Sequence, residues 1–549
     1  MELIGREYAM EHSKPSYYIT TPIYYVNAKP HLGTAYSTVM ADVQARFQRA
    51  NAHDVKFLTG MDEHGEKVAE AAEKNGFDSP QAWCDSMEPK FRDLWETLSI
   101  SNDDFIRTTQ DRHTAGVQKF LQVLLDHGYI YKDSYDGWYC RPDETYFTET
   151  QVRHHEEERR AKGMDAADPE HPLCPDCDRP LERIQEESWF FKLSAFEQPL
   201  LDFYEAHPDF IQPETRRNEV LSFVKGGLKD LSISRSTFDW GIQFPFDPKH
   251  VAYVWVDALI NYLSAVGYGA EGQEAADEVA FRWPAQVHVV GKDIIRFHCV
   301  IWPALLMAAG LPLPERVFVH GFLTVRNEET GAAEKMSKSR GNAIAPEEVI
   351  ELLGVDAYRY YFMCDVAHGT DAPISWGRMR QVYNADLANS WGNLVSRSLN
   401  MAGKYFDGCA PVRPANFEQE TPLKEACEGI YERYAARMEA FDYSGAAQEV
   451  LAVVSAANHY IEDMAPWGLA KDPERADELA LVIWNLLEVI RIASELYAPF
   501  MPSVSAEVRR RLSLPQEATS NLAEACQWGG LAGGEPVEKG DPLFPRLVD

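Results

Sequence analysis

The chain has 549 residues, of which 45% are hydrophobic and 25% are charged. These proportions exclude a disordered or fibrous protein, and the length allows two to four packed units at the roughly 150 residues that one domain usually takes. The 53 lysines and arginines and the 85 aspartates and glutamates give a net charge of −32. Any nucleic-acid partner must therefore bind a confined basic and aromatic surface rather than the protein as a whole.

The same sequence predicts the cellular compartment. No uninterrupted apolar run reaches the roughly 18 residues that cross a bilayer, and the first residues lack the apolar core of a signal peptide. The nine cysteines are an odd number and are thinly spread, unlike a secreted disulfide framework. We therefore expect a cytoplasmic protein with no membrane partner, in which most cysteines are small buried side chains.

The first part of the chain alternates strands with helices. β-Branched and aromatic residues at 17–27 predict a buried strand, which a glycine turn joins to a helix. An apolar segment at 55–60 leads through a polar turn into a second helix. This alternation is typical of a parallel sheet with helices on both faces.

Residues 132–238 interrupt that rhythm and predict an inserted unit, because they are rich in tyrosine and tryptophan and hold three of the nine cysteines. Alternation then returns, and long amphipathic patterns further on predict a helical bundle. We therefore expect an α/β fold with a split Rossmann-like domain and a C-terminal bundle. The expected division is 14–131 and 239–325 for the Rossmann-like halves, 132–238 for the insertion, 326–382 for a connecting segment and 383–549 for the bundle.

A His-x-Gly turn lies where the first predicted strand passes into its helix. The carboxyl end of a strand and the N-terminus of the next helix form a crevice that favours phosphate. Gly33 lets a ligand approach the backbone, and His31 can donate a hydrogen bond to charge that develops on phosphate. Taken alone, such a turn is more often structural than catalytic.

The segment KMSKSRGN at residues 335–342 forms a basic loop far downstream. Most Lys/Ser runs are solvated loops. Combined with the His-x-Gly helix start, however, this loop resembles the signature pair of class I aminoacyl-tRNA synthetases. In that family the carboxylate of an amino acid attacks the α-phosphate of ATP, and the protein supplies positioning and charge neutralisation. The resemblance implies that ATP and Mg²⁺ are bound and that the catalytic residues are His31, Lys335 and Lys338.

A longer series of segments resembles the methionyl-tRNA synthetases in order and spacing. It includes TTPIYYVNAKPHLG, FLTGMDEHGEKV, YVWVDALINY and GKDIIRFH. The resemblance implies a class I Rossmann-like catalytic domain, a zinc-knuckle insertion and a helical domain that binds the anticodon. The implied enzyme is a methionine-tRNA ligase, which forms methionyl-adenylate and pyrophosphate and then loads the terminal adenosine of tRNA(Met) for translation.

By this resemblance ATP binds at strand ends and at the signature loop. Asp293 follows a predicted strand, where its carboxylate can accept from ribose hydroxyls, although a helix cap would also explain it. Many class I enzymes carry a second histidine where this chain has Thr34, whose hydroxyl can still donate to phosphate. The implied ATP-binding residues are His31, Gly33, Thr34, Gly291, Asp293, Lys335 and Lys338.

The methionine pocket implied by the resemblance is largely aromatic and aliphatic. Ile294 and His298 are four residues apart and so share one helix face, and aromatic rings make favourable contacts with a thioether. Each aromatic side chain alone would be interpreted as core packing. The implied pocket residues are Ile23, Tyr25, Trp255, Ala258, Leu259, Tyr262, Ile294 and His298, with Asp62 near the substrate amino group.

The predicted insertion contains a C-P-D-C motif at residues 174–177 and the segment C-R-P-D at residues 140–143. A CxxC in a proline-rich knuckle, away from a thioredoxin-like strand and helix, favours zinc over an unmetallated knuckle. Family members often have two cysteine knuckles here, and Asp143 stands where a second cysteine would complete the first. We expect a structural Zn²⁺ with ligands Cys140, Asp143, Cys174 and Cys177. The alternatives for the fourth ligand are His154, His155 and His171.

In the predicted bundle, Asn393 and Arg397 are four residues apart on one helix, and a proline precedes Trp467. By the resemblance these residues read the CAU anticodon, because the aromatic ring stacks on a base while Asn and Arg bond base edges. A Pro-Trp pair otherwise packs a helix end. Such a confined surface makes tRNA binding compatible with the acidic net charge.

Two other functions share parts of this pattern. A synthetase for isoleucine, valine or leucine would carry the signature pair, but usually with a far longer editing insertion. A catalytically inactive tRNA-binding paralogue would keep the fold, yet the KMSKS loop is intact. Many relatives continue past an LFPR-like segment into a dimerising RNA-binding domain, and this segment lies at residues 543–546 here. We therefore expect a monomer, or a dimer if a C-terminal extension is missing.

Overall fold

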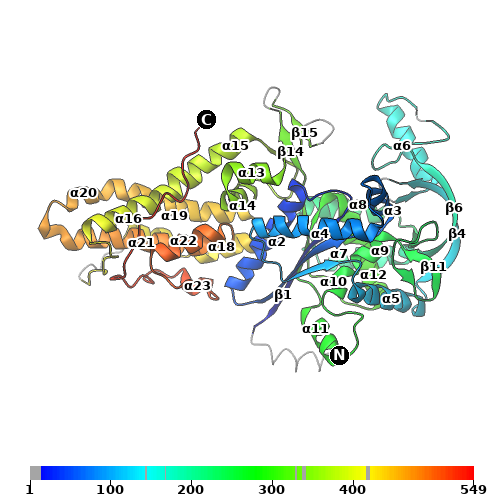
Figure 1. Cartoon of the computed structure of the whole chain (residues 1–549), viewed down its shortest axis with the longest axis horizontal. Coiled ribbons are helices and arrows are strands. Elements are labelled where there is room, and N and C mark those ends of the chain that lie inside the picture. The colour runs from blue at the N-terminus through cyan, green and yellow to red at the C-terminus, as the bar shows by residue number, and fades with distance from the viewer. Residues whose placement is uncertain are drawn as a thin grey trace.

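The computed structural model describes residues 14–141, 145–166, 168–327, 331–336, 342–415, 421–517 and 519–548. An α/β domain and its inserted unit lie at one end of an elongated molecule, and a helical bundle extends to the other end (Figure 1). This architecture confirms the predicted α/β fold with a C-terminal bundle. Within these ranges, no helix combines the length and the apolar character needed to span a lipid bilayer.

Six parallel strands form the central sheet in the order β3-β2-β1-β12-β13-β7. β1 pairs with β2 on one side and with β12 on the other. The chain builds outward on both sides of β1, so the carboxyl ends of β1 and β12 flank the topological switch point where open α/β sheets bind ligands. The strands span Ser16–Tyr25 (β1), Asp54–Asp62 (β2), Asp104–Arg107 (β3), Ile211–Gln212 (β7), Val287–Gly291 (β12) and Val317–His320 (β13).

Helices cover both faces of the sheet, so alternate residues of β1 enter two different cores. Ile19 joins a core with residues of α2 (Leu32–Ala50) and α4 (Pro80–Thr97). Its neighbour Tyr18 joins a second core with residues of α5 (Asp111–Asp126) and α12 (Trp302–Ala309). Burial on both faces explains why the sequence of β1 is apolar and aromatic almost throughout. The other helices of this domain are α3 (Glu66–Lys74), α7 (Glu197–Ala206), α8 (Glu214–Lys225), α9 (Val254–Leu259), α10 (Asn261–Ser264) and α11 (Gln273–Arg282).

The inserted unit is built on an antiparallel ribbon of β4 (Ile130–Cys140) and β6 (Glu182–Phe191), within a sheet of order β5-β4-β6-β8. It projects beyond the central sheet together with α6 (Glu149–Ala161) (Figure 1). Its small core consists of Trp138, Cys140, Phe147, Val152, Cys174 and Leu181. The remaining short strands here and alongside are β5 (Thr145–Phe147), β8 (Leu231–Ser232), β9 (Ser234–Arg235), β10 (Gln243–Phe244) and β11 (Asp247–Ala252).

After β13 the chain forms a second small sheet and then enters the bundle. The strands β14 (Leu323–Arg326), β15 (Ala333–Lys335) and β16 (Ala372–Ile374) make a sheet of order β15-β14-β16. In the bundle every residue of α21 from Leu481 to Tyr497 is buried, so α21 is its central helix. The helices are α13 (Pro346–Leu353), α14 (Val355–Cys364), α15 (Trp376–Val382), α16 (Asn393–Tyr405), α17 (Pro422–Cys427), α18 (Ile430–Glu439), α19 (Tyr443–Met464), α20 (Pro466–Leu469), α21 (Ala476–Tyr497), α22 (Pro502–Arg511) and α23 (Leu522–Ala525).

A buried arginine joins α2 of the α/β domain to the bundle. Arg359 of α14 is fully buried and forms an ion pair with Asp42 of α2, with 2.6 Å between Nη2 and Oδ2. The guanidinium also donates to the carbonyls of Leu98, Pro499 and Phe500. A buried charge is tolerated when it is paired and hydrogen-bonded, so this residue ties α2 to the segment between α21 and α22.

Candidate active site

The predicted substrate residues collect at the carboxyl edge of the central sheet. Tyr25 ends β1, Asp62 ends β2 and Gly291 ends β12. Tyr25 lies in register with Asp62, and Gly291 lies in register with His320 at the end of β13. The structure therefore brings residues from four separate strands to the switch point, which is where the fold favours a ligand.

His31 is the N-cap of α2 and is exposed at the start of this helix. Its Nδ1 accepts a hydrogen bond from the N–H of Thr34, with an N···N distance of 3.2 Å. Because Nδ1 accepts, the neutral ring carries its proton on Nε2. The imidazole thus lies where the N–H groups of the first helical turn favour phosphate.

Thr34 and Gly33 hold that ring in place. The Thr34 hydroxyl accepts a hydrogen bond from the His31 N–H at 3.2 Å, which completes a capping box, and Thr34 itself is buried. A Cβ added to Gly33 would lie 3.1 Å from Cε1 and 3.2 Å from Nδ1 of His31. The glycine therefore leaves the space that the imidazole occupies, and the threonine orients it.

Gly291 plays a similar part for Asp293. A Cβ added to Gly291 would lie 2.4 Å from Oδ1 of Asp293 and 3.5 Å from Cε1 of His320. Asp293 lies inside the short helical turn Lys292–Ile294, whose N-cap is Gly291, so the helix-cap explanation of Asp293 is wrong. Its carboxylate folds back toward the end of β12, at the same edge as His31.

The predicted methionine-pocket residues share one side of the domain. Leu259 and Tyr262 are buried in one core, and Ile23, Tyr25, Trp255 and Ile294 pack against the same core. Ala258 and His298 are also buried. The ring of Trp255 stacks on Phe297, with centroids 3.7 Å apart and planes 10° apart. Phe297 was not predicted, although it follows Ile294 by three residues and so lies on the same helix face.

Tyr262 and His298 form a neutral hydrogen-bonded pair. The Ile294 carbonyl can only accept, so Nδ1 of His298, at 3.1 Å, carries the proton. Nε2 of His298 therefore accepts from the Tyr262 hydroxyl at 2.7 Å. Burial lowers the pKa of His298 to about 4, and burial raises the pKa of Tyr262. At neutral pH this wall of the candidate pocket is polar but uncharged.

The structure describes only the start of the signature loop. Lys335 ends β15, and its backbone lies in register with Thr324 of β14. Lys338 falls within residues 337–341, outside the described residues. The described start of the loop belongs to β15, in the small sheet of order β15-β14-β16.

Three cysteines converge in the inserted unit. The Sγ atoms of Cys140, Cys174 and Cys177 all lie within 4.8 Å of one another, and those of Cys140 and Cys177 are 3.6 Å apart. Two thiolates on a tetrahedral zinc ion with bonds of roughly 2.3 Å would be about 3.8 Å apart. The thiol geometry therefore fits zinc. Asp143 lies outside the described residues.

None of the three alternative histidines joins this group in the described part of the chain. Nε2 of His155 lies 2.9 Å from Oδ1 of Asp178, and Nδ1 of His171 lies 3.4 Å from the Leu181 carbonyl. His154 is exposed beside Glu158, at 3.8 Å. The fourth ligand therefore stays a prediction.

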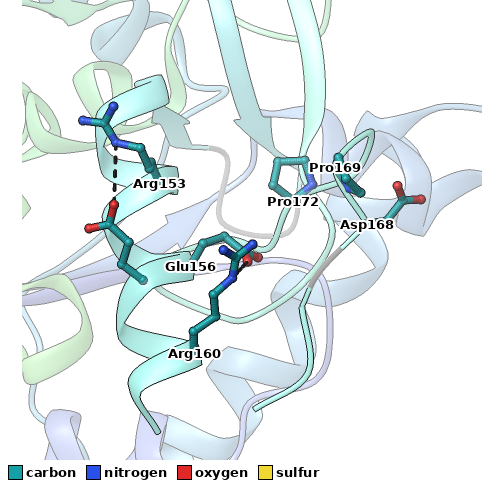
Figure 2. A pocket seen from close by; sticks show the side chains of 7 residues that line it. Arg153, Glu156, Arg160, Asp168, Pro169 and Pro172 are labelled. Carbon is teal, nitrogen blue, oxygen red and sulfur yellow. Dashed lines mark ion pairs between the residues drawn. The ribbon is translucent and has the colours of Figure 1, made fainter. Parts of the chain in front are cut away.

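A groove on the inserted unit runs beside α6, as Figure 2 shows. Arg153 pairs with Glu157 and Arg160 pairs with Glu156, each at 4.0 Å. Paired charges of this kind are typical of a solvated helix face and contribute little stability. The groove lies outside the central sheet, so we assign it no part in the candidate active site. Its lining residues are Arg153, Glu156, Glu157, Arg160, Asp168, Pro169 and Pro172.

The three predicted anticodon residues lie around the end of α19. Nδ2 of Asn393 donates to Oδ1 of Asn458 at 3.1 Å. Four residues further along both helices, Nη2 of Arg397 pairs with Oε1 of Glu462 at 2.7 Å. Trp467 lies in α20, directly after α19, and is 43% exposed. The ring is therefore accessible at the surface, and its part in reading the anticodon stays a prediction.

One buried cluster beside the pocket was not predicted. The Asp257 carboxylate contacts both His64 and His113. The sequence contains a signal for this cluster. The segment VWVDAL places an acidic residue within an apolar helix, where it needs a buried partner, and the segment MDEHGEK offers a histidine. Both segments also contain predicted pocket residues.

Comparisons with known proteins agree with this geometry. A family model of "tRNA synthetases class I (M)" matches residues 17–399, and a model of the "Anticodon binding domain of methionyl tRNA ligase" matches residues 411–549. The chain belongs to the methionyl-tRNA ligase family. The predicted family and class I membership are thereby confirmed.

Individual relatives in this family match over nearly the whole chain. Methionine–tRNA ligase of Caldanaerobacter subterraneus is 46% identical over 97% of this chain and 79% of its own length. That of Streptomyces coelicolor is 45% identical over 97% of both chains. Mycobacterium tuberculosis methionyl-tRNA synthetase in complex with methionyl-adenylate has a TM-score of 0.88 and 40% identity, covering 97% of this chain and 100% of its own. Its apo form has a TM-score of 0.82 and 36% identity, covering 98% and 99%.

Proposed function

We propose that this enzyme activates methionine with ATP and then transfers the methionyl group to the terminal adenosine of tRNA(Met). The observation that carries this proposal is the convergence of His31, Asp62 and Gly291 at the carboxyl ends of β1, β2 and β12. The structural relative with bound methionyl-adenylate supports methionine as the amino acid. The match to an anticodon-binding domain supports tRNA as the acceptor.

The activation step asks the protein for positioning and charge neutralisation. A carboxylate oxygen of methionine attacks the α-phosphorus of ATP, and the bond to the bridging oxygen breaks so that pyrophosphate leaves with the electron pair. We assign His31, Lys335 and Lys338 to the charge that develops on the phosphates. Mg²⁺ bound to ATP would neutralise further phosphate charge. The proposed ATP contacts are those residues together with Gly33, Thr34, Gly291 and Asp293.

The proposed methionine site has a charged end and a neutral end. Asp62, at the end of β2, receives the substrate ammonium, while the neutral Tyr262–His298 pair and the Trp255 ring surround the thioether. Apolar contacts separate aliphatic substrates only weakly, so a sulfur–aromatic contact adds selectivity for methionine. The walls are completed by Ile23, Tyr25, Ala258, Leu259 and Ile294.

The inserted unit would hold a structural zinc ion through Cys140, Asp143, Cys174 and Cys177. Its core of six buried side chains is small, and a metal at the thiols would cross-link β4 to the knuckle at residues 174–177. In this position zinc supplies cohesion rather than chemistry.

We assign the CAU anticodon to the surface formed by Asn393, Arg397 and Trp467. The exposed ring of Trp467 offers a stacking platform beside two side chains that can bond base edges. The proposed division of the chain has catalytic halves at 14–131 and 239–325, an insertion at 132–238, a connecting segment at 326–382 and an anticodon domain at 383–549. Within that insertion, β7 pairs with β13, so the part around β7 belongs to the central sheet. We expect the enzyme to act in the cytoplasm.

Amino-acid-dependent exchange between ATP and pyrophosphate tests the proposal. The purified chain is assayed with each of the twenty amino acids, followed by aminoacylation of tRNA(Met). Exchange that depends on methionine is expected. Faster exchange with isoleucine, valine or leucine would contradict the methionine assignment. Binding of tRNA without exchange for any amino acid would identify a catalytically inactive paralogue.

A further inference from the structure

Asp257 occupies a buried junction beside the candidate methionine pocket. Its Oδ2 lies 2.8 Å from Nδ1 of His64, and its Oδ1 lies 2.8 Å from Nε2 of His113. Asp257 and His113 are fully buried, and His64 is buried too. A carboxylate only accepts hydrogen bonds, so both imidazoles donate to it.

The carboxylate at this junction is ionised. Burial alone would raise the pKa of Asp257, but the electrostatic interaction with His64 and the hydrogen bonds from His113 and His64 lower it to about 2. A buried charge is costly unless its partners satisfy it, and here both oxygens have N–H donors. Removing either donor therefore disturbs the whole cluster.

The three residues belong to three different elements. His64 follows Asp62 by two residues, just past the end of β2. His113 lies in α5, and Asp257 lies in α9 between Trp255 and Ala258. The junction thus joins the segment that carries the proposed ammonium ligand to the helix that carries three proposed pocket residues, Trp255, Ala258 and Leu259.

A second set of contacts fixes the helix that follows α9. Nδ1 of His113 lies 3.1 Å from Oγ of Ser264 in α10. A Cβ added to Gly116, also on α5, would lie 2.4 Å from that same Oγ, so α5 and α10 approach closely. The Tyr18 hydroxyl donates to the Tyr262 carbonyl at 2.8 Å. The segment that bears Tyr262 is therefore held from two sides.

We propose that Asp257 is a positioning residue that sets the distance between the ammonium end and the thioether wall of the methionine pocket. It acts through His64 on the Asp62 end and through its own helix on Trp255 and Ala258. Through His113 and Ser264 it acts on α10, which bears Tyr262. Because it is fully buried, it acts without touching the substrate. This inference rests on the proposed function and adds a residue to it.

The proposal predicts different effects on the binding of methionine and of ATP. The proposed ATP contacts lie on other segments: His31 follows β1, Gly291 ends β12 and Asp293 follows it, and neither strand holds a member of the junction. A displacement of α9 would therefore alter methionine binding while the phosphate and ribose contacts stay in place. Misplacement of a positioning element by about 1 Å is enough to cost a large factor in rate.

Asp257→Asn is the direct test, since it keeps the shape and removes the charge. The amide oxygen accepts from one histidine, but the NH₂ group meets the N–H of the other, which must rotate or change tautomer. In pyrophosphate exchange we expect KM for methionine to rise about 10- to 100-fold, the range of a lost charged hydrogen bond. KM for ATP should stay within about twofold of the wild type, well inside one factor of ten.

Two further variants at His113 distinguish the hydrogen bond from packing. His113→Gln keeps an N–H that can donate to Asp257 and should retain most of the wild-type affinity for methionine. His113→Leu fills the space without a donor and should raise KM for methionine as Asp257→Asn does. These variants also keep the proposal testable if Asp257→Asn fails to fold.

Glu495→Gln is a matched control in the bundle. Glu495 and Arg509 form a buried ion pair between α21 and α22, with 2.5 Å between Oε2 and Nη2. Losing this carboxylate should lower Tm without changing either KM. If Asp257→Asn changes neither KM, or raises both equally together with a loss of Tm, the positioning role is overturned. If the wild type shows no methionine-dependent exchange, the proposed function itself fails, which is a separate result.

Discussion

The imidazole of His31 and the hydroxyl of Thr34 cap α2 reciprocally, each accepting the backbone N–H of the other residue at 3.2 Å. The threonine at this place in the signature turn therefore has a local partner, and its side chain is buried. This arrangement makes Thr34 an orienting residue for His31, in addition to the phosphate contact expected from the sequence.

Thr34→Val tests that orienting role, because it keeps the shape and removes the hydroxyl. Losing half of a capping box should lower the free energy of unfolding by about 0.5–2 kcal/mol. The rate of pyrophosphate exchange should fall with it, since the His31 backbone loses its acceptor. Ser79→Ala is the matched control, because Ser79 caps α4 by accepting from the Ala82 N–H at 3.1 Å. The control should lose similar stability and keep its exchange rate.

Gly33→Ala should separate activity from stability. The added Cβ would lie 3.1 Å from Cε1 of His31, so the imidazole must shift away from its position. Alanine favours a helix over glycine by up to about 1 kcal/mol, so Tm should hold or rise while exchange falls. Gly403→Ala in α16 is the control, because its Cβ would meet no described atom within 4 Å. Unchanged exchange in Gly33→Ala would show that the ring has room to move without consequence.

Lys338→Ala tests the signature loop. If Lys338 stabilises charge on the departing pyrophosphate, exchange should fall by about 10²–10³-fold, as for the loss of one transition-state charge donor. KM for methionine should change little, since the proposed pocket lies on other elements. Lys162→Ala, at the exposed C-cap of α6, is the control for loss of a lysine. A Lys338→Ala enzyme with the wild-type rate would remove this residue from the mechanism.

The metal prediction concerns the inserted unit alone. Metal analysis should find about one zinc per chain, and Cys174→Ser should lose it together with the stability of the small core around Cys140. Cys364→Ser, a buried cysteine of α14 outside the cluster, should keep the metal. Asp143→Ala should bind zinc more weakly. Zinc-free protein with full activity and unchanged Tm would favour an unmetallated knuckle.

Much of this architecture could be predicted because its signals are local. Local residue patterns predicted a strand at 17–27, a glycine turn and a helix after it. The structure forms β1 and α2 at these positions. The cysteine spacing likewise predicted a cluster that the described residues form. Contacts between distant segments left no such local pattern. Asp257 meets its histidines only because β2, α5 and α9 fold together, and Arg359 meets Asp42 only because α14 packs on α2.

The stacking of Phe297 on Trp255 illustrates the same limit inside the pocket. The spacing from Ile294 places Phe297 on the pocket face of its helix. Nothing in the sequence, however, pairs its ring with that of Trp255, which lies in a distant segment of the chain. Pairing of this kind depends on tertiary packing rather than on local propensity. The elements of the site could therefore be predicted from the sequence better than the contacts that hold them.

The last prediction concerns the anticodon surface. Stacking of a base on an aromatic ring contributes roughly 1–3 kcal/mol, and that energy is available only in the tRNA-dependent step. Trp467→Ala should leave pyrophosphate exchange nearly intact and lower aminoacylation of tRNA(Met) by about one to two powers of ten. Tm should hold, because the ring is 43% exposed and gives up little packing. Trp467→Phe should recover part of the aminoacylation rate.

Arg397→Ala should behave in the same way, through lost bonds to base edges and without a change in exchange. Trp528→Ala is the control for a packing tryptophan, because its half-buried ring packs against the core and meets the Trp484 ring edge-on, with centroids 5.7 Å apart. That variant should lower Tm and both steps together. If Trp467→Ala shows this second pattern, then Trp467 packs a helix end and the anticodon is read elsewhere on the bundle.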